Sequence, residues 1–413
     1  MENGDQKIKK IGIIREGKVP PDQRVPLAPK QCREVLDNFP GLDLVVQPSP
    51  VRKYTAQQYT NFQIPLQEDL SDCDVIMGVK EVPIDMLIPN KTYFFFSHTI
   101  KEQPYNRDLL RAILDKNIRL VDWETLTARS GRRLIGFGRY AGIVGCYNGF
   151  IAEGRRSGRY ELKPAYQCYD RLEMESELHK VKLPGNYKIV MTGGGRVAGG
   201  AIEILEALGI QKVDHLSFLN ETFDEPVYTQ LQVEHYYEHM HGKEWDKYHF
   251  YQNPGDYIST FKPYTQVADM YIACHYWDSD APYIFERDDM LADGFSLSVV
   301  SDISCDIDGP VPPTIRPSTI ENPLFAYDPI QHKEVEWNAP GSIAVMAVDN
   351  LPCELPKDAS EDFGSELMEH IMPALLRDDP NEIISRATIA ENGRLTKNFG
   401  YLQGYVDGVP AEG

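Results

Sequence analysis

The chain has 413 residues, of which 42% are hydrophobic and 25% charged, as in globular proteins long enough for two or three domains. Its formal charge of −20 disfavours nucleic acid and anionic membranes as main partners. The start, MENGDQKIKKIG, lacks the apolar core of a secretory signal, no apolar run is long enough to span a bilayer, and the seven cysteines form no C-x-x-C pair. We therefore expect a cytoplasmic protein with reduced thiols and neither a nucleic-acid nor a membrane partner.

Strand-like and helical segments alternate in the first third of the chain. A helix is expected from Pro29, because proline suits the first helical turn, and another at 106–115. This alternation predicts an α/β fold with a doubly wound parallel sheet. The strand-like runs lie at 8–14, 42–46, 74–80, 93–97 and 120–123.

Ionisable residues follow four of these predicted strands. Arg15, Lys80, His98 and Glu124 come at or just after the strand ends. In open α/β sheets, ligands bind outside the carboxyl ends of the strands. We therefore expect the four side chains to converge on one crevice, although charges at strand ends can also be merely solvated.

A glycine turn between a strand and a helix marks the middle of the chain. The strand is predicted at 188–192 and the helix at 196–208, preceded by a long helix at 136–150 whose small residues are spaced for close packing. The turn fits the G-x-G-x-x-G/A pattern of dinucleotide binding, in which the helix N-terminus faces the phosphates. The predicted cofactor-binding residues of this segment are Gly193, Gly194, Gly195, Arg196, Val197 and Ala198.

The second strand of this unit is predicted at 215–219. An acidic residue at that strand's end usually holds the ribose of NAD, and the chain has Asn220 and Glu221 there, one or two places late. The choice between NAD and NADP therefore stays open. A further strand, MYIACHYW, is expected to turn its end, Cys274, His275 and Tyr276, toward the cofactor.

Two further segments carry expectations of their own. His235, His239 and His241 share helical spacing, but no cysteine or acidic partner completes a metal site, so we predict a structural group and no metal. A helix is expected at 359–376 with a kink at Pro373, because proline breaks the helical hydrogen-bond ladder.

Several motifs occur in the order in which one enzyme family has them. These are IREGKVPPDQRVPLAP, GVKEVP, FFFSHTIKEQ and RLVDWETLTARSGRRLIGFGRYAGIVG, followed by YQNPGDYISTFKPYT, SDISCDIDG and RATIAENGRLTKNFGYL. The chain resembles the lysine–ketoglutarate reductase and saccharopine dehydrogenase family, within the alanine dehydrogenase-like superfamily. The later half is most similar to the lysine–ketoglutarate reductase part of aminoadipic semialdehyde synthases.

The resemblance implies two Rossmann-like domains flanking a cleft. The first would comprise residues 1–140 plus 335–413, and the second, inserted at 141–334, would bind NAD(P)H. The implied reaction joins lysine and 2-oxoglutarate to saccharopine, or the reverse, so the expected partners are these small molecules. Neither the direction of the reaction nor the choice between monomer and homodimer follows from the sequence.

The resemblance also implies roles for single residues. Lys80 and His98 match the family's acid–base pair, which the proton transfers of imine chemistry require. Asp302 matches an aspartate near the nicotinamide. The positions that match substrate-binding residues are Arg24, Glu124, Arg133 and Phe137, and Arg15 is added from its place at a strand end.

Some features depart from the family pattern. The turn TGGGRVAGG is one residue shorter than in the fungal enzymes, and no clear arginine for a 2′-phosphate is present, Arg196 being the nearest candidate. Two alternatives stay open: another amino-acid or opine dehydrogenase on the same scaffold, and a non-catalytic nicotinamide-binding sensor.

Overall fold

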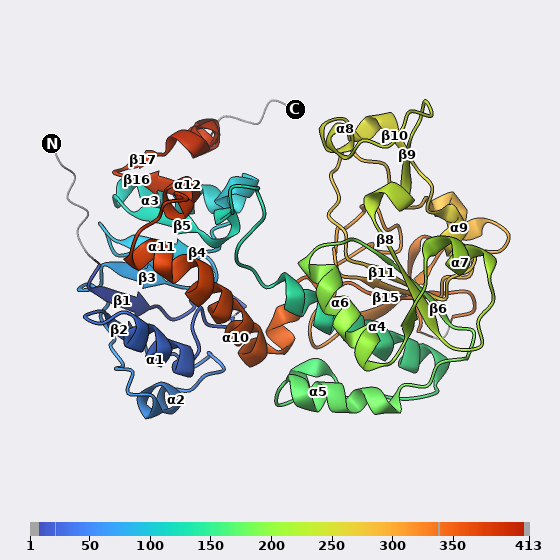
Figure 1. The fold of residues 1–413 in the computed structure, drawn as a ribbon, viewed down its shortest axis with the longest axis horizontal. Coiled ribbons are helices and arrows are strands. Elements are labelled where there is room, and N and C mark those ends of the chain that lie inside the picture. Colours follow the sequence, from blue (N-terminus) through green and yellow to red (C-terminus); the bar gives the residue numbers. More distant parts are fainter. Residues whose placement is uncertain (1–7, 21, 338, 409–413) are drawn as a thin grey trace. The chain divides into compact units, whose positions relative to one another are not determined.

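A computed structural model describes residues 8–20, 22–337 and 339–408 (Figure 1). The chain divides into two compact units, unit 1 at 1–137 with 356–413, and unit 2 at 138–355. Unit 2 is thus inserted, in the sequence, between the two segments of unit 1. The domain limits that the resemblance implies stay a prediction.

Unit 1 is built on a seven-stranded sheet in the order β17-β16-β5-β4-β3-β1-β2. The five strands from the N-terminal segment are parallel, and the returning C-terminal segment adds the antiparallel pair β16 and β17 at the β5 edge. The strands are β1 (Lys10–Ile13), β2 (Asp43–Val46), β3 (Val75–Met77), β4 (Thr92–Phe95), β5 (Arg119–Asp122), β16 (Thr388–Glu391) and β17 (Arg394–Leu395).

Both faces of this sheet are buried, because successive side chains of a strand point to opposite faces. In β4, Phe94 joins the core on one face, while Tyr93 and Phe95 join the core on the other. This explains why the strands read as continuous apolar runs. The helices of unit 1 are α1 (Pro29–Asn38), α2 (Ala56–Asn61), α3 (Arg107–Asp115), α10 (Pro356–Glu366), α11 (Met372–Leu376), α12 (Ile383–Ala387) and α13 (Gln403–Asp407).

The predicted helix at 359–376 is interrupted before Pro373. Helix α10 passes into a π-helical turn at Leu367–Ile371, and α11 then begins with Pro373 in its first turn. Proline has no N–H to donate and its ring crowds the carbonyl four residues earlier. That carbonyl belongs to Glu369, inside the π turn, so the α-helix is interrupted upstream of the proline, and the kink itself stays a prediction.

Unit 2 is built on an eight-stranded sheet in the order β14-β13-β15-β12-β11-β6-β8-β7. It is parallel from β15 to β7, whereas β13 and β14 are antiparallel. Its strands are β6 (Lys188–Thr192), β7 (Gln211–Lys212), β8 (Val227–Leu231), β11 (Met270–Ala273), β12 (Val299–Asp302), β13 (Leu324–Asp328), β14 (Lys333–Val335) and β15 (Ile343–Met346). A separate hairpin pairs β9 (Tyr237–His239) with β10 (Tyr257–Ser259).

Two helices of unit 2 cross at very short range. A Cβ atom built on Gly142 of α4 (Gly138–Ser157) would lie 1.8 Å from the carbonyl oxygen of Val197 in α6 (Arg196–Ala207). A Cβ on Gly200 would lie 1.9 Å from the carbonyl oxygen of Arg139. The small residues of the predicted long helix therefore serve close packing, as expected. The other helices of unit 2 are α5 (Arg171–Glu177), α7 (His215–Asn220), α8 (Lys247–Gln252) and α9 (Lys262–Thr265).

Candidate functional site

The strand order of unit 1 creates a topological switch point between β1 and β3. Strand β1 pairs with β2 on one side and β3 on the other, so the connections that follow β1 and β3 diverge at their carboxyl ends. Glu16, which follows β1, spans this point: its carboxylate accepts hydrogen bonds from the backbone N–H groups of Val79 (2.7 Å) and Lys80 (2.8 Å). Burial raises the pKa of Glu16 to about 7. The backbone at Lys80 is thus fixed by a carboxyl group at the place where ligands bind in such sheets.

Glu81 connects the predicted acid–base residues. Its Oε1 atom lies 2.7 Å from Nδ1 of His98, and Nζ of Lys18 donates to both of its oxygens at 2.9 and 2.8 Å. Burial alone would raise the pKa of Glu81, but the hydrogen bonds from His98 and Lys18 lower it to about 2. The carboxylate is therefore charged, and the ring of His98 also stacks on Phe96 with 6.3 Å between centroids.

Lys80 lies in a charged and largely enclosed environment. Burial lowers the pKa of its ammonium group, and the neighbouring Arg24 cation lowers it further. Arg24 itself forms a buried bidentate pair with Asp22, at 3.0 Å from Nε and 2.6 Å from Nη2. Burial opposes ionisation of Asp22, but Arg24 brings its pKa down to about 2. The structure therefore gives Arg24 a carboxylate partner within the chain.

Aromatic rings link these residues to the returning C-terminal segment. The guanidinium of Arg24 lies 4.2 Å from the ring centroid of Phe137, and Phe137 stacks on Phe363 of α10 at 4.5 Å. The ring centroid of Phe96, on which His98 stacks, lies 6.1 Å from the ring centroids of both Phe137 and Phe363. Lys80, His98, Arg24 and Phe137, four of the predicted residues, are thus joined by one set of charge and ring contacts.

The other predicted residues of unit 1 contact different partners. Glu124 Oε1 accepts from Arg133 Nη2 at 2.9 Å, and its Oε2 atom is buried without a hydrogen-bond partner. Arg15 pairs with the exposed Glu68. Of the four residues expected to converge, Lys80 and His98 are joined through Glu81, and Arg15 and Glu124 pair with other residues, so the convergence of all four side chains stays a prediction.

The sequence reasoning missed several residues of this group. Glu81 could have been found as the acidic residue directly after Lys80 in GVKEVP, and Asp22 as a charged neighbour of Arg24 in PPDQR. Glu16 could likewise have been found as the acidic residue directly after Arg15, with Lys18 two residues further on. Phe363 gives no such signal, because it lies on α10 in the returning segment.

Unit 2 has its own switch point, and the glycine turn lies on it. Strand β6 pairs with β8 on one side and β11 on the other, and the turn follows β6 directly. Gly193 has a φ of +105°, and a Cβ atom there would lie 2.4 Å from the carbonyl oxygen of Cys274 after β11. Both the backbone conformation and the close approach therefore require glycine.

The strand predicted at 215–219 is wrong. These residues form helix α7, because Asp214 caps it by accepting from the backbone N–H groups of Leu216 (3.0 Å) and Ser217 (3.1 Å). The strand that pairs with β6 on the side away from β11 is β8, which ends at Leu231. Asn220 and Glu221, chosen because they would end a strand, lie exposed at the C-terminal end of α7 instead.

The turn and its neighbours fit a dinucleotide. A Cβ atom on Gly195, the N-cap of α6, would meet nothing within 4 Å, so open space lies in front of the helix N-terminus. Arg196, Val197 and Ala198 form the first turn of α6, and the small, buried Ala198 lets the helix pack closely.

The strand end beside the turn carries an unsatisfied buried atom. His275 is buried after β11, its Nδ1 lies 2.8 Å from Thr192 Oγ1, and its Nε2 has no hydrogen-bond partner. Burial lowers the pKa of His275 to about 4, so the ring is neutral at neutral pH. Its neighbour Cys274 is buried, whereas Tyr276 is exposed.

Asp302 ends β12 and is fully buried. Its two carboxylate oxygens accept hydrogen bonds from Ser304 Oγ (2.5 Å), Cys305 N (3.0 Å) and Thr314 Oγ1 (2.6 Å). Burial raises the pKa of this carboxyl despite these donors. Asp302 therefore anchors the loop at 304–314, and its predicted role beside the nicotinamide stays a prediction.

The histidines considered as metal ligands do not share a helix. His235 ends a short 3-10 turn and stacks on His215, with 4.3 Å between centroids, whereas His239 ends strand β9. The expectation that no acidic residue accompanies them was wrong, because Asp256 lies beside His239, together with His249.

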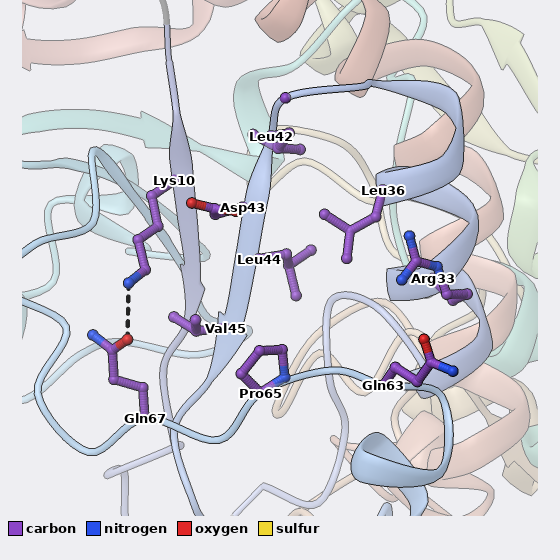
Figure 2. Close-up of a pocket in the computed structure, with 11 residues that line it drawn as sticks. Lys10, Arg33, Leu36, Leu42, Asp43, Leu44, Val45, Gln63, Pro65 and Gln67 are labelled. Carbon is purple, nitrogen blue, oxygen red and sulfur yellow. Dashed lines mark hydrogen bonds between the residues drawn. The ribbon is translucent and has the colours of Figure 1, made fainter.

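A surface hollow in unit 1 lies apart from these groups. It is bordered by α1, by β2 and by residues 63–67, and Lys10 Nζ donates to Gln67 Oε1 at 2.8 Å on its rim (Figure 2). Lys10 and Asp43 stand at the amino ends of β1 and β2. Three charged residues, Lys10, Arg33 and Asp43, line the hollow, and none of the predicted site residues does.

Comparison with known proteins places this architecture in a class. Residues 12–144 match the family model of the alanine dehydrogenase/PNT N-terminal domain. An L-alanine dehydrogenase structure covers 97% of this chain and 99% of its own, with a TM-score of 0.65 and 14% identity. A transhydrogenase from Sinorhizobium meliloti covers 94% of this chain and 98% of its own, with a TM-score of 0.57 and 13% identity. The protein thus has an alanine dehydrogenase-like fold of two Rossmann-like α/β units, as the sequence predicted.

Sequence relatives narrow the class. The mitochondrial alpha-aminoadipic semialdehyde synthase of Bos taurus is 31% identical over 437 residues, which cover 92% of this chain and 46% of the bovine protein. The saccharopine dehydrogenase (NAD(+), L-lysine-forming) of Yarrowia lipolytica is 26% identical over 388 residues, or 88% of this chain and 92% of the yeast protein. The chain spans about half the length of the semialdehyde synthases it matches. The predicted resemblance is confirmed: along most of its length the chain is similar to alpha-aminoadipic semialdehyde synthases and to saccharopine dehydrogenases.

Among the helices of the described residues, none combines the length and the apolar character that a membrane crossing requires.

Proposed function

We propose that this protein is an NAD(P)-dependent oxidoreductase that acts on the C–N bond of saccharopine, joining lysine and 2-oxoglutarate or cleaving their product. The observation that carries the proposal is the Lys80–Glu81–His98 group at the switch point of unit 1, where a partly desolvated amine adjoins a carboxylate-bound imidazole. The names of the relatives, which include a saccharopine dehydrogenase, support the choice of substrate.

The proposed chemistry assigns a proton transfer to each member of the pair. The amine of lysine adds to the carbonyl carbon of 2-oxoglutarate, and water then leaves to give an imine. Burial and Arg24 lower the pKa of Lys80, which increases the neutral fraction able to accept the proton of the amine. His98, bound through Nδ1 to charged Glu81, has Nε2 free to protonate the departing oxygen.

Unit 2 supplies the proposed cofactor site. When bound, NAD(P)H would supply the hydride for the carbon of the protonated imine, which would give the secondary amine and NAD(P)+. The turn at Gly193–Gly195 and the first turn of α6 would hold its pyrophosphate. The residue after β8 is Gln232, which is neither the carboxylate typical of NAD sites nor a cation for a 2′-phosphate. We therefore propose that both cofactors be tested.

Two substrates and two cofactors test the proposal. Purified protein, lysine and 2-oxoglutarate are mixed with NADH or NADPH, and the absorbance of the reduced nicotinamide is followed. Loss of absorbance that requires both substrates is the expected result, and the faster cofactor identifies the phosphate preference. No loss with either cofactor, on protein that binds one of them, contradicts the choice of substrates.

A double variant tests the assigned roles. Lys80→Met with His98→Gln should lower kcat by at least about a hundredfold, because both proton transfers lose their groups. The dissociation constant of NAD(P)H should stay unchanged, since the proposed cofactor residues lie in unit 2. Lys30→Met with His370→Gln, the same exchanges on helical segments of unit 1, serves as the matched control. Retained turnover in the first variant would disprove the roles.

A further inference from the structure

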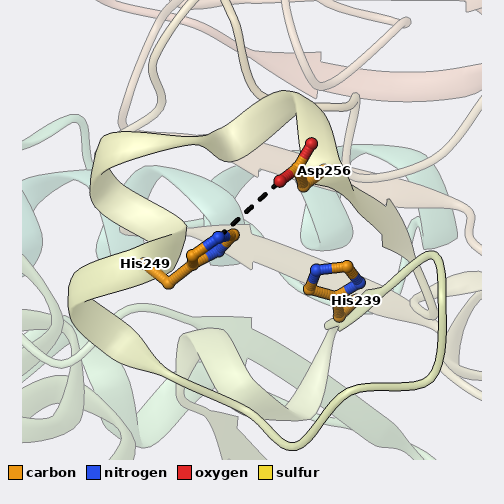
Figure 3. A group of neighbouring side chains, drawn as sticks. All are labelled: His239, His249 and Asp256. Atoms are coloured by element: carbon orange, nitrogen blue, oxygen red, sulfur yellow. Dashed lines mark ion pairs between the residues drawn. The ribbon is translucent and has the colours of Figure 1, made fainter.

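Three side chains from separate segments of unit 2 converge at one end of the β9–β10 hairpin (Figure 3). His239 ends β9 and lies opposite Tyr257 of β10, His249 comes from helix α8, and Asp256 immediately precedes β10. One nitrogen or carboxylate oxygen of each residue lies within 4.8 Å of the others. His249 Nε2 and Asp256 Oδ2 are 3.7 Å apart.

The contacts of Tyr257 allow the tautomer of His249 that a metal ligand needs. When Tyr257 donates its hydroxyl hydrogen to the carbonyl oxygen of Asp246 (3.3 Å), it can accept from His249 Nδ1–H (3.1 Å). The lone pair of His249 Nε2 then faces the carboxylate of Asp256. This is the tautomer that a metal-binding histidine has when an outer hydrogen bond orients it.

His239 contributes an unsatisfied buried nitrogen. Its side chain is only 4% exposed, and its Nε2 atom has no hydrogen-bond partner. One ring nitrogen of His239 faces His249 and Asp256 in Figure 3.

We infer that His239, His249 and Asp256 bind one divalent cation of the zinc type, with water as the fourth ligand. Two imidazole nitrogens and one carboxylate oxygen are a common donor set for Zn²⁺. Ligand atoms around tetrahedral zinc are roughly 3.4 Å apart, given bonds of about 2.0–2.1 Å. The 3.7 Å pair already has nearly this spacing, and the ligand atom of His239 lies within 4.8 Å of both partners.

Binding of the cation would break one hydrogen bond of the backbone. In this structure the N–H of His241 donates to His239 Nδ1 at 3.1 Å. Coordination through Nε2 requires that Nδ1 of the His239 ring carry the proton. The backbone N–H of His241 then loses its acceptor and must hydrogen-bond to water instead. His241 is exposed, which allows the exchange. The cation would fasten α8 and the β9–β10 hairpin together, independently of any activity.

The test uses full-length protein stripped with EDTA and titrated with Zn²⁺ by calorimetry, with Co²⁺ absorption as a measure of tetrahedral geometry. The wild type should bind one Zn²⁺ per chain. His249→Ala and Asp256→Asn, whose side chains are partly or largely exposed, should each weaken binding at least tenfold and remove the Co²⁺ bands. Tyr257→Phe should weaken binding about 10- to 100-fold, because the orienting hydrogen bond is lost.

His179→Ala is the matched control, because it removes an exposed histidine of the same unit that lies outside the group. Its Zn²⁺ affinity should equal that of the wild type. Circular dichroism of the metal-free variants verifies that they fold. Absence of saturable Zn²⁺ binding by the wild type, or equal affinity in the wild type, His249→Ala and Asp256→Asn, would overturn the site.

Discussion

Glu354 is a carboxyl group enclosed in unit 2, where it is only 2% exposed. Its Oε1 atom accepts a hydrogen bond from Asn148 Nδ2 of α4 at 2.7 Å. Burial raises its pKa to about 8 from an ordinary value of 4.5, although the bond from Asn148 opposes the shift. The group is therefore largely protonated in the folded protein at neutral pH, which the resemblance to a known family did not suggest.

A pH-dependent stability follows from this raised pKa. The folded state keeps a proton that the unfolded state releases, so the contribution is complete below pH 4.5 and is lost as the pH rises through 8. The variant Glu354→Gln has a side chain of the same shape that does not ionise. Urea unfolding should show the wild type losing stability relative to the variant, by on the order of 4 kcal/mol across this range.

The exposed Glu225→Gln serves as a control and should follow the wild-type profile. If wild type and Glu354→Gln keep a constant difference between pH 4.5 and 8, the carboxyl does not titrate as described.

At the scale of residues, the sequence located the strand-end groups but not their partners. Lys80 and His98 could be predicted because strand ends in α/β sheets meet at one edge. The ion pair of Arg15 could not, because Glu68 is distant in the sequence and only the fold brings it near. The pair of Arg24 with Asp22 could have been found from their proximity in the sequence. The pairing of Arg24 with Asp22 matters most, since a predicted substrate arginine already has a carboxylate.

The glycine turn makes an element-scale prediction about the cofactor. A side chain at Gly195 meets no protein atom within 4 Å, and its φ of −91° suits any residue, so Gly195→Val should fold normally. The same side chain would occupy the space before the α6 N-terminus, where the pyrophosphate is proposed to bind. NAD(P)H fluorescence titration should show at least a tenfold weaker affinity. Unchanged affinity in the folded variant would contradict a pyrophosphate at this turn.

The crossing of α4 and α6 leads to a second prediction at the scale of elements. Gly200→Ala places a Cβ atom 1.9 Å from a backbone oxygen, so the helices must separate, and the free energy of unfolding should fall by about 1–3 kcal/mol or more. Gly199→Ala is the neighbouring control: its Cβ meets nothing within 4 Å, and alanine favours the helix by up to about 1 kcal/mol. Chemical denaturation of both variants measures the difference, and equal effects would refute the close crossing.

Helices with a clear apolar periodicity could be predicted from the sequence. A helix that depends on one N-cap side chain could not. The helix at 196–208 combines apolar periodicity with a glycine turn, and it was found within one residue of its observed end. The strand at 215–219 was expected from its place about twenty residues past the glycine turn, but the side chain of Asp214 satisfies two N–H groups and starts a helix there. That error displaced the predicted ribose contacts to Asn220 and Glu221.

At the scale of the whole molecule, the two units have separate cores, and the proposed cofactor residues belong to one of them. A ligand that binds only the folded state stabilises it by about 2.7 kcal/mol at a hundred times its dissociation constant. NAD(P)H should therefore raise the unfolding temperature of unit 2 by roughly 5–10 °C, and shift unit 1 less.

Tryptophan fluorescence can separate the two units. Trp123 is the only tryptophan in the sequence of unit 1, so replacing Trp245, Trp277 and Trp337 with phenylalanine leaves a reporter for that unit. Circular dichroism then follows the whole chain. A cofactor-induced shift of the Trp123 transition as large as that of the whole chain would show that the cofactor stabilises both units together.

Because unit 2 is inserted between the two segments of unit 1, the ribosome completes unit 2 before it makes the second segment of unit 1. Edge strands β16 and β17, and Phe363 in the aromatic stack, follow unit 2 in the sequence. On a ribosome adding about 5–20 residues per second, unit 1 waits on the order of ten to forty seconds for these parts. During this interval β5 has no edge partner, and its exposed backbone can pair with other chains. Nascent unit 1 is thus a natural client for chaperones, whereas unit 2 is complete before the last segment emerges.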